Sequence, residues 1–182
     1  MRAIGFAGWG GAGKTTLIVR LIPALNRRGF SVSTIKHAHH DFDVDQPGKD
    51  SYEHRAAGAR EVVVVSANRL ALMRELRGAP EPTLAELLRL IAPVDLVLVE
   101  GFKRDPLPKI EVHRAANGKP SLHPQDDDIV ALVTDSADPP TRLPHAPIDD
   151  VAAVADLVLE HAAPIAAILE RFERSTLRAS DA

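Results

Sequence analysis

Residues Gly8–Thr15 read G-W-G-G-A-G-K-T and match the phosphate-binding consensus G-x-x-x-x-G-K-[ST] at every position. Glycines let such a loop turn its backbone N–H groups inward, where they form an anion site with the following helix N-terminus. Lys14 is expected to reach the terminal phosphates, and Thr15 to ligate Mg²⁺. The segment predicts that the chain binds a nucleoside triphosphate, with a chance glycine turn as the alternative. The expected phosphate-site residues are Gly8, Trp9, Gly10, Gly11, Ala12, Gly13, Lys14, Thr15 and Thr16.

A second candidate is Glu100, which ends the strand-like segment V-D-L-V-L-V-E. In phosphate-loop folds the strand beside the loop delivers an acid to the water shell of Mg²⁺, so Glu100 is predicted to share this ion with Thr15. Asp95 lies near the start of the same segment, about 16 Å away at 3.3 Å per residue, and is expected to be out of reach. A solvated loop acid is the alternative interpretation of Glu100.

Asp135 closes the buried-strand pattern Ile129–Asp135 at the same expected sheet edge. An aspartate at such a position can accept hydrogen bonds from the N1 and N2 groups of guanine. The full Asn/Thr-Lys-x-Asp signature is not present, and an ordinary turn cap is the alternative. The choice between guanine and adenine therefore stays open on the motif alone.

The segment Lys36–Asp50 is polar, rich in His and Asp, and lacks any period, which predicts a loop of about 15 residues. Its acids could add to the Mg²⁺ and phosphate site, or its His cluster could bind Zn, Ni or Cu. A third interpretation is that Lys36, Lys49, His54 and Arg55 grip an anionic partner molecule. A solvated polar loop is the remaining alternative.

The elements that must position these residues follow from the hydrophobic pattern. Arg2–Ala7 is predicted to be a buried strand, Lys14–Arg28 an amphipathic helix, and Phe30–Ile35 a second strand. Such a β–α–β unit favours a parallel sheet with right-handed crossovers. Further strands are predicted at Glu61–Ala67, Val94–Val99, Lys109–His113 and Ile129–Val133, and helices at Ser51–Ala59, Thr83–Ile91, Asp149–His161 and Pro164–Arg174. Arg69–Leu76 fits a strand or a helix, and we choose a strand paired to Glu61–Ala67.

The predicted fold class is α/β, a P-loop NTPase with a mostly parallel sheet flanked by helices and an added β-hairpin. We expect a single domain over residues 1–175 and a frayed tail at 176–182, because 182 residues suit one domain. The exposed hairpin around Glu61–Leu76 is the predicted dimer surface.

Composition excludes several classes of function. The chain has no cysteine, which rules out a disulfide framework, a thiolate metal site, an iron–sulfur cluster and a cysteine nucleophile. A formal charge of −3 makes broad nucleic-acid binding unexpected. Because no apolar stretch approaches the roughly 18 residues of a membrane span, no membrane association is expected, and a cytoplasmic location is predicted.

Three segments together resemble the molybdopterin-guanine dinucleotide biosynthesis adaptor (MobB) family. They are Gly8–Thr16 (GWGGAGKTT), Thr34–Ala59 (TIKHAHHDFDVDQPGKDSYEHRAAGA) and Asp95–Lys103 (DLVLVEGFK). The middle block is similar to that family's own signature and differs from a generic NTPase motif. The resemblance covers Met1 to about Val112, and later only the strand Ile129–Val133 and the closing helix follow it.

The resemblance implies a homodimeric GTP-binding protein with weak GTPase activity that assists the guanylyltransferase joining GMP to molybdopterin. The expected ligands are GTP, Mg²⁺ and, with direct binding left open, molybdopterin or its guanine dinucleotide form. Lys14, Asp41, Asp50 and Glu100 are carried over as catalytic residues, and Thr15 and Glu100 as the metal-side groups. Lys36, His37, Lys49, His54 and Arg55 would lie near the γ-phosphate or the pterin, and Asp135 near the base. Slow turnover fits, because no arginine finger or catalytic glutamine is evident in the sequence.

Two other functions compete. A GTP-dependent metallochaperone is favoured by the His cluster, although such proteins usually add cysteines or a longer His tract. A P-loop small-molecule kinase could hold its acceptor through Lys36, Arg55 and Lys103. The arginines available for a kinase lid are spread through a predicted strand, which counts against the kinase hypothesis. They are Arg69, Arg74 and Arg77.

Overall fold

The structure is a computed structural model that describes residues 1–38 and 42–180, without side chains at 176–180. The chain divides into two compact units, one formed by Met1–His37 with Leu84–Ala182 and the other by Ala38–Thr83. One domain over residues 1–175 stays a prediction. Within the described residues, no helix combines the length and the apolar character needed to cross a bilayer.

The larger unit is built on a sheet with strand order β2-β5-β1-β6-β7-β8, in which all neighbours on this path pair in parallel. These strands are β1 (Arg2–Ala7), β2 (Val32–Lys36), β5 (Leu96–Glu100), β6 (Lys109–His113), β7 (Ile129–Thr134) and β8 (His145–Pro147). The short β9 (Ala163–Pro164) pairs antiparallel with β1. The predicted α/β fold with a mostly parallel sheet is confirmed, whereas β8 and β9 were not predicted.

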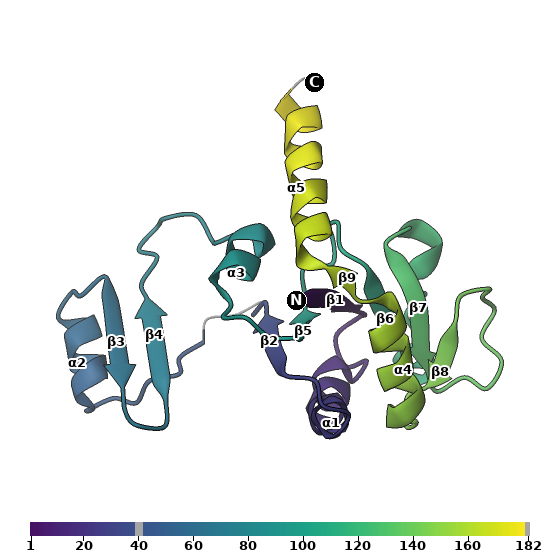
Figure 1. Ribbon diagram of the computed structural model, residues 1–182, viewed down its shortest axis with the longest axis horizontal. Coiled ribbons are helices and arrows are strands. Elements are labelled where there is room, and N and C mark those ends of the chain that lie inside the picture. Colours follow the sequence, from purple (N-terminus) through teal and green to yellow (C-terminus); the bar gives the residue numbers. More distant parts are fainter. Residues whose placement is uncertain (39–41, 181–182) are drawn as a thin grey trace. The chain divides into compact units, whose positions relative to one another are not determined.

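Helices cover both faces of this sheet (Figure 1). They are α1 (Lys14–Arg27), α3 (Leu84–Leu90), α4 (Val151–His161) and α5 (Ile165–Ser180), with 3-10 turns η1 (Ala115–Asn117) and η2 (His123–Gln125). Alternate residues of β5 point to opposite faces, so Leu98 packs with α1 and α4 while Val99 packs with α3 and α5. Each face of the central strands is therefore apolar, which is why the sequence of β5 reads as a continuous hydrophobic run.

The starts of β2 and β5 are joined by a clamp between Ser31 and Asp95. The Asp95 carboxylate accepts hydrogen bonds from the Ser31 hydroxyl at 2.6 Å and from the Ser31 amide at 2.8 Å. These bonds hold the pKa of Asp95 below its usual value. Asp95 therefore serves a structural role at the end of β5 opposite Glu100.

Strand β6 is buried and yet carries two charged side chains on one face. Lys109 and Glu111 are 1% and 0% exposed. Lys109 Nζ lies 3.0 Å from Asp126 Oδ2, and the Glu111 carboxylate accepts hydrogen bonds from the amides of Leu122 and His123. Each buried charge is therefore paired with the segment that leads into β7.

The smaller unit contains α2 (Asp50–Ala56) and an antiparallel hairpin of β3 (Glu61–Val65) and β4 (Leu70–Arg74). Its register places Val63 opposite Leu72, and the Ser66 amide closes the turn by donating to the Arg69 carbonyl at 2.8 Å. The predicted added hairpin is confirmed.

Candidate functional site at the phosphate loop

The phosphate loop joins the end of β1 to the start of α1, and its first glycine cannot be replaced without strain. Gly8 has φ +148°, and a Cβ there would lie 2.4 Å from the carbonyl oxygen of Val112 in β6. Only a residue without a side chain fits this close approach. At the other end of the loop, Gly13 adopts the left-handed conformation before the first turn of α1. The unpaired amides at the start of that helix therefore border the loop.

Lys14 lies across the loop rather than in solvent. Its Nζ donates to the carbonyl oxygens of Gly8 at 3.0 Å and of Trp9 at 3.1 Å. Burial lowers the pKa of Lys14, as do the charges of Lys103 and Lys36, while Glu100 acts in the opposite direction. Several cations thus converge here, and an anion such as a phosphate group would relieve their mutual repulsion.

Thr15 and Glu100, predicted to share Mg²⁺, are in direct contact. The Thr15 hydroxyl donates to Glu100 Oε1 at 2.7 Å. The parallel register that sets Glu100 beside Phe6 brings the end of β5 to the loop. Lys36 Nζ lies 3.2 Å from Thr15 Oγ1 and 3.7 Å from Glu100 Oε2. A hydroxyl and a carboxylate in this arrangement are the oxygen donors that suit Mg²⁺.

His37 packs on the turn that follows Glu100. Its amide donates to the Glu100 carbonyl at 2.9 Å, and its ring lies 5.1 Å from that of Phe102, centroid to centroid. Gly101 has φ +98°, and a Cβ there would meet the His37 Cβ at 2.7 Å. His37 therefore fixes the backbone next to Glu100.

A segment that the sequence did not single out runs beside the phosphate loop after β6. Arg114 Nε donates to the Ala12 carbonyl at 3.3 Å, and Asn117 Nδ2 donates to the Gly10 carbonyl at 3.4 Å. The Trp9 indole N–H donates to the Pro120 carbonyl at 2.8 Å. The sequence signal that could have identified Arg114 is its position directly after β6, a neighbour of β1. The ends of parallel strands meet at one edge of the sheet, so this position lies next to the phosphate loop.

Asp135 lies at the end of β7, where it binds this same segment. Its Oδ1 accepts a hydrogen bond from the Ala115 amide at 2.9 Å. The Asp135 side chain therefore lies at the sheet edge that carries the phosphate loop, where it caps the backbone at Ala115. Its contact with a guanine base stays a prediction.

Comparison with known proteins decides the family. The family model of MobB, molybdopterin guanine dinucleotide synthesis protein B, matches residues 3–135. The chain belongs to the MobB family. It is 44% identical over 162 residues to the molybdopterin-guanine dinucleotide biosynthesis adapter protein of Escherichia coli (strain K12), covering 86% of this chain and 91% of that protein. The adapter protein of the same name from Haemophilus influenzae is 43% identical over 136 residues, or 72% and 73% of the two chains.

Solved MobB structures have the same fold. The Bacillus subtilis MobB crystal structure superposes with a TM-score of 0.69 at 26% identity, covering 89% of this chain and 98% of that one. A crystal structure of molybdopterin-guanine biosynthesis protein B gives a TM-score of 0.68 at 27% identity, with coverage of 87% and 98%.

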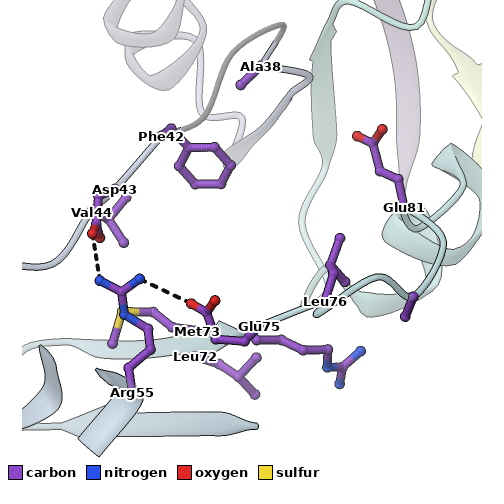
Figure 2. A pocket seen from close by; sticks show the side chains of 12 residues that line it. Ala38, Phe42, Asp43, Val44, Arg55, Leu72, Met73, Glu75, Leu76 and Glu81 are labelled. Carbon is purple, nitrogen blue, oxygen red and sulfur yellow. Dashed lines mark hydrogen bonds and ion pairs between the residues drawn. The ribbon is translucent and has the colours of Figure 1, made fainter. Parts of the chain in front are cut away.

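Arg55, another predicted residue of the segment Thr34–Ala59, lies in the smaller unit and is already paired with carboxylates. Its guanidinium contacts Asp43 Oδ2 at 2.6 Å and Glu75 Oε1 at 3.1 Å (Figure 2). These carboxylates raise the pKa of Arg55 above its usual value. These three residues line a hollow of about 790 Å³ together with apolar residues such as Phe42 and Leu72. A phosphate or pterin at Arg55 would have to compete with two carboxylates.

Lys49 directly precedes α2, and Asp50 and His54 lie within it, so all three belong to the smaller unit. His39, His40 and Asp41 fall outside the described residues, so the catalytic role predicted for Asp41 has no structural counterpart here. Over residues 1–38 and 42–180, no group of three or more His, Cys, Asp or Glu side chains is arranged to hold a metal ion.

Proposed function

We propose that this chain is a molybdopterin-guanine dinucleotide biosynthesis adapter that binds GTP with Mg²⁺ at its phosphate loop. The adapter role is supported by family membership and by the names of the relatives from Escherichia coli and Haemophilus influenzae. The observation that carries nucleotide binding is the contact between Thr15 and Glu100 next to the loop that Lys14 crosses. Together these groups offer one cationic and one oxygen-rich surface to a triphosphate.

In this proposal Lys14 and the loop amides hold the phosphates, while Thr15 and Glu100 hold Mg²⁺ directly or through water. Bound Mg²⁺ would supply charge neutralisation at the phosphate oxygens. Hydrolysis is proposed to be slow, because the sequence offers no evident arginine finger or catalytic glutamine. The proposed partner is the guanylyltransferase that attaches GMP to molybdopterin, and the proposed location is the cytoplasm.

Trp9 is the single tryptophan and lies inside the loop, so its emission reports binding directly. We expect GTP with Mg²⁺ to change this emission at concentrations at least about ten-fold lower than ATP, and omission of Mg²⁺ to weaken the response about ten-fold. In Glu100→Gln the Mg²⁺ effect is expected to fall below about two-fold, because the anionic metal-side oxygen is lost. A response to ATP alone would contradict the proposal and favour the kinase alternative.

We also propose that the protein is a homodimer joined through the hairpin. One face of this two-stranded sheet is apolar and exposed, with Val63, Val65 and Leu70 exposed by 57%, 70% and 67%. On the opposite face Val62 is buried. An exposed apolar face of this kind marks a surface that a partner covers. A second copy supplies the same apolar strands and open backbone edges.

Sedimentation velocity tests this dimer. The double substitution Val63→Lys, Val65→Lys places like charges in the proposed interface and is expected to shift the protein from dimer to monomer at micromolar concentration. Val19→Lys, which adds a charge at an exposed site on α1, is the control and should leave the mass unchanged. A wild-type monomer, or a dimer that survives the double substitution, would contradict the hairpin interface.

A further inference from the structure

Lys103 is carried by an unusual turn immediately after Glu100. Gly101 has φ +98° and Phe102 has φ +50°, so two successive residues adopt left-handed backbone and one of them is not glycine. Such conformations persist only where the surroundings over-determine them, and they concentrate at binding and catalytic sites. The turn redirects the chain so that Lys103 returns toward the phosphate loop instead of continuing along β5.

The backbone of Lys103 is also held by hydrogen bonds from Lys109. The buried Nζ of Lys109 donates to the carbonyl oxygens of Lys103 and Asp105, both at 3.1 Å. The same Nζ lies 3.0 Å from Asp126 Oδ2 and 3.7 Å from Asp128 Oδ2, and these contacts hold it in place. The position of residue 103 is therefore set by the buried Lys109 and its ion pairs.

The side chain of Lys103 lies over the loop. Its Nζ is 5.1 Å from the centroid of the Trp9 ring, within the range of a cation–π contact. The ring is fixed in turn by the indole bond to Pro120. Lys103 is also near enough to Lys14 to lower the pKa of that residue, so two ammonium groups share one small region.

We propose that Lys103 is a phosphate-binding residue of this site, held on the face of Trp9 until its ammonium contacts the terminal phosphate of a bound nucleoside triphosphate. This rests on the proposed nucleotide binding and adds a residue with a specific task. A charge-assisted bond to phosphate is stronger than a cation–π contact at a partly exposed ring, so the exchange is favourable. It also explains why a lysine is held so close to Lys14, since a triphosphate supplies enough negative charge for both.

The test compares Lys103→Met with Arg104→Met by calorimetric titration of GTP and GDP in the presence of Mg²⁺. Arg104 is exposed on the same turn, so its substitution changes net charge equally and serves as the matched control. We expect Lys103→Met to weaken GTP binding about ten-fold or more and GDP binding less than about three-fold. Arg104→Met should leave both within about two-fold, and Lys103→Arg should retain most of the GTP affinity.

Equal losses of GTP and GDP affinity in Lys103→Met, or equal effects of the two substitutions, would overturn the proposal. The Trp9 emission of nucleotide-free Lys103→Met is expected to differ from that of wild type, because the ammonium has left the ring. An unchanged emission would overturn the ring-bound position. If the wild-type protein binds neither nucleotide, the proposed function fails with this inference; if it binds GTP and Lys103→Met binds GTP equally well, only this inference fails.

Discussion

Gly8→Ala is expected to lower the free energy of unfolding by about 3–5 kcal/mol, the largest effect of any single methyl group in the phosphate loop. The new Cβ would lie 2.4 Å from the Val112 carbonyl oxygen, at a φ of +148° that side chains rarely adopt. Relief requires β1 and β6 to separate, and they are neighbours in the middle of the sheet. Urea unfolding followed by circular dichroism measures the loss.

Gly10→Ala is the matched control, because a Cβ at Gly10 meets nothing within 4 Å and its φ is not in the left-handed region. We expect this variant to unfold within about 0.5 kcal/mol of wild type. The two substitutions add the same methyl group two residues apart. Equal stability of the two variants would show that the approach of Gly8 to β6 is not as close as described.

Lys14→Ala is expected to weaken triphosphate binding by about 100-fold or more, equivalent to about 2.7 kcal/mol. The ammonium is already held over the loop by the Gly8 and Trp9 carbonyls, so it is pre-positioned for the phosphates. Calorimetric titration with GTP and Mg²⁺ gives the loss. Arg27→Ala removes an exposed cation from the opposite end of α1 and should change the affinity less than two-fold. Undiminished binding in Lys14→Ala would place the triphosphate elsewhere.

The same lysine sets an expected pH dependence. In the free protein, burial and neighbouring cations lower the pKa of Lys14 below its usual value of 10.5, whereas phosphate oxygens would raise it on binding. Affinity should therefore be constant at lower pH and fall as the pH rises through the free-protein pKa. On unfolding the sign reverses: the unfolded chain binds more protons in that window, so the contribution of Lys14 to stability increases with pH. Both slopes should vanish in Lys14→Ala.

The sequence predicted the elements whose cause is local. The bounds of β1 and β6 agree with the predicted Arg2–Ala7 and Lys109–His113, because each is a short β-favouring run that ends where the pattern breaks. Strands β8 and β9 have three and two residues and include Pro147 and Pro164, so they carry no period to detect. They form because β7 and β1 offer backbone groups to pair with, which is a tertiary cause.

The same distinction holds for the site. The meeting of Thr15 and Glu100 could be predicted, since neighbouring parallel strands bring their ends to one edge. The placing of Lys103 and Arg114 beside the loop depends on a left-handed turn and on hydrogen bonds between distant segments. The pairing of Arg55 with Asp43 and Glu75 was likewise invisible, because charge type alone does not say which partner is nearest.

The paired charges on β6 have a consequence for the chain before it folds. Neighbouring strands β1 and β5 are apolar segments of the kind that associate between chains when exposed during synthesis. Strand β6 pairs with β1 and is equally buried, yet the carboxylates that pair with Lys109 and the amides that bind Glu111 lie in the later segment 122–128. We therefore expect these charges to oppose association between nascent chains until the folded protein pairs them.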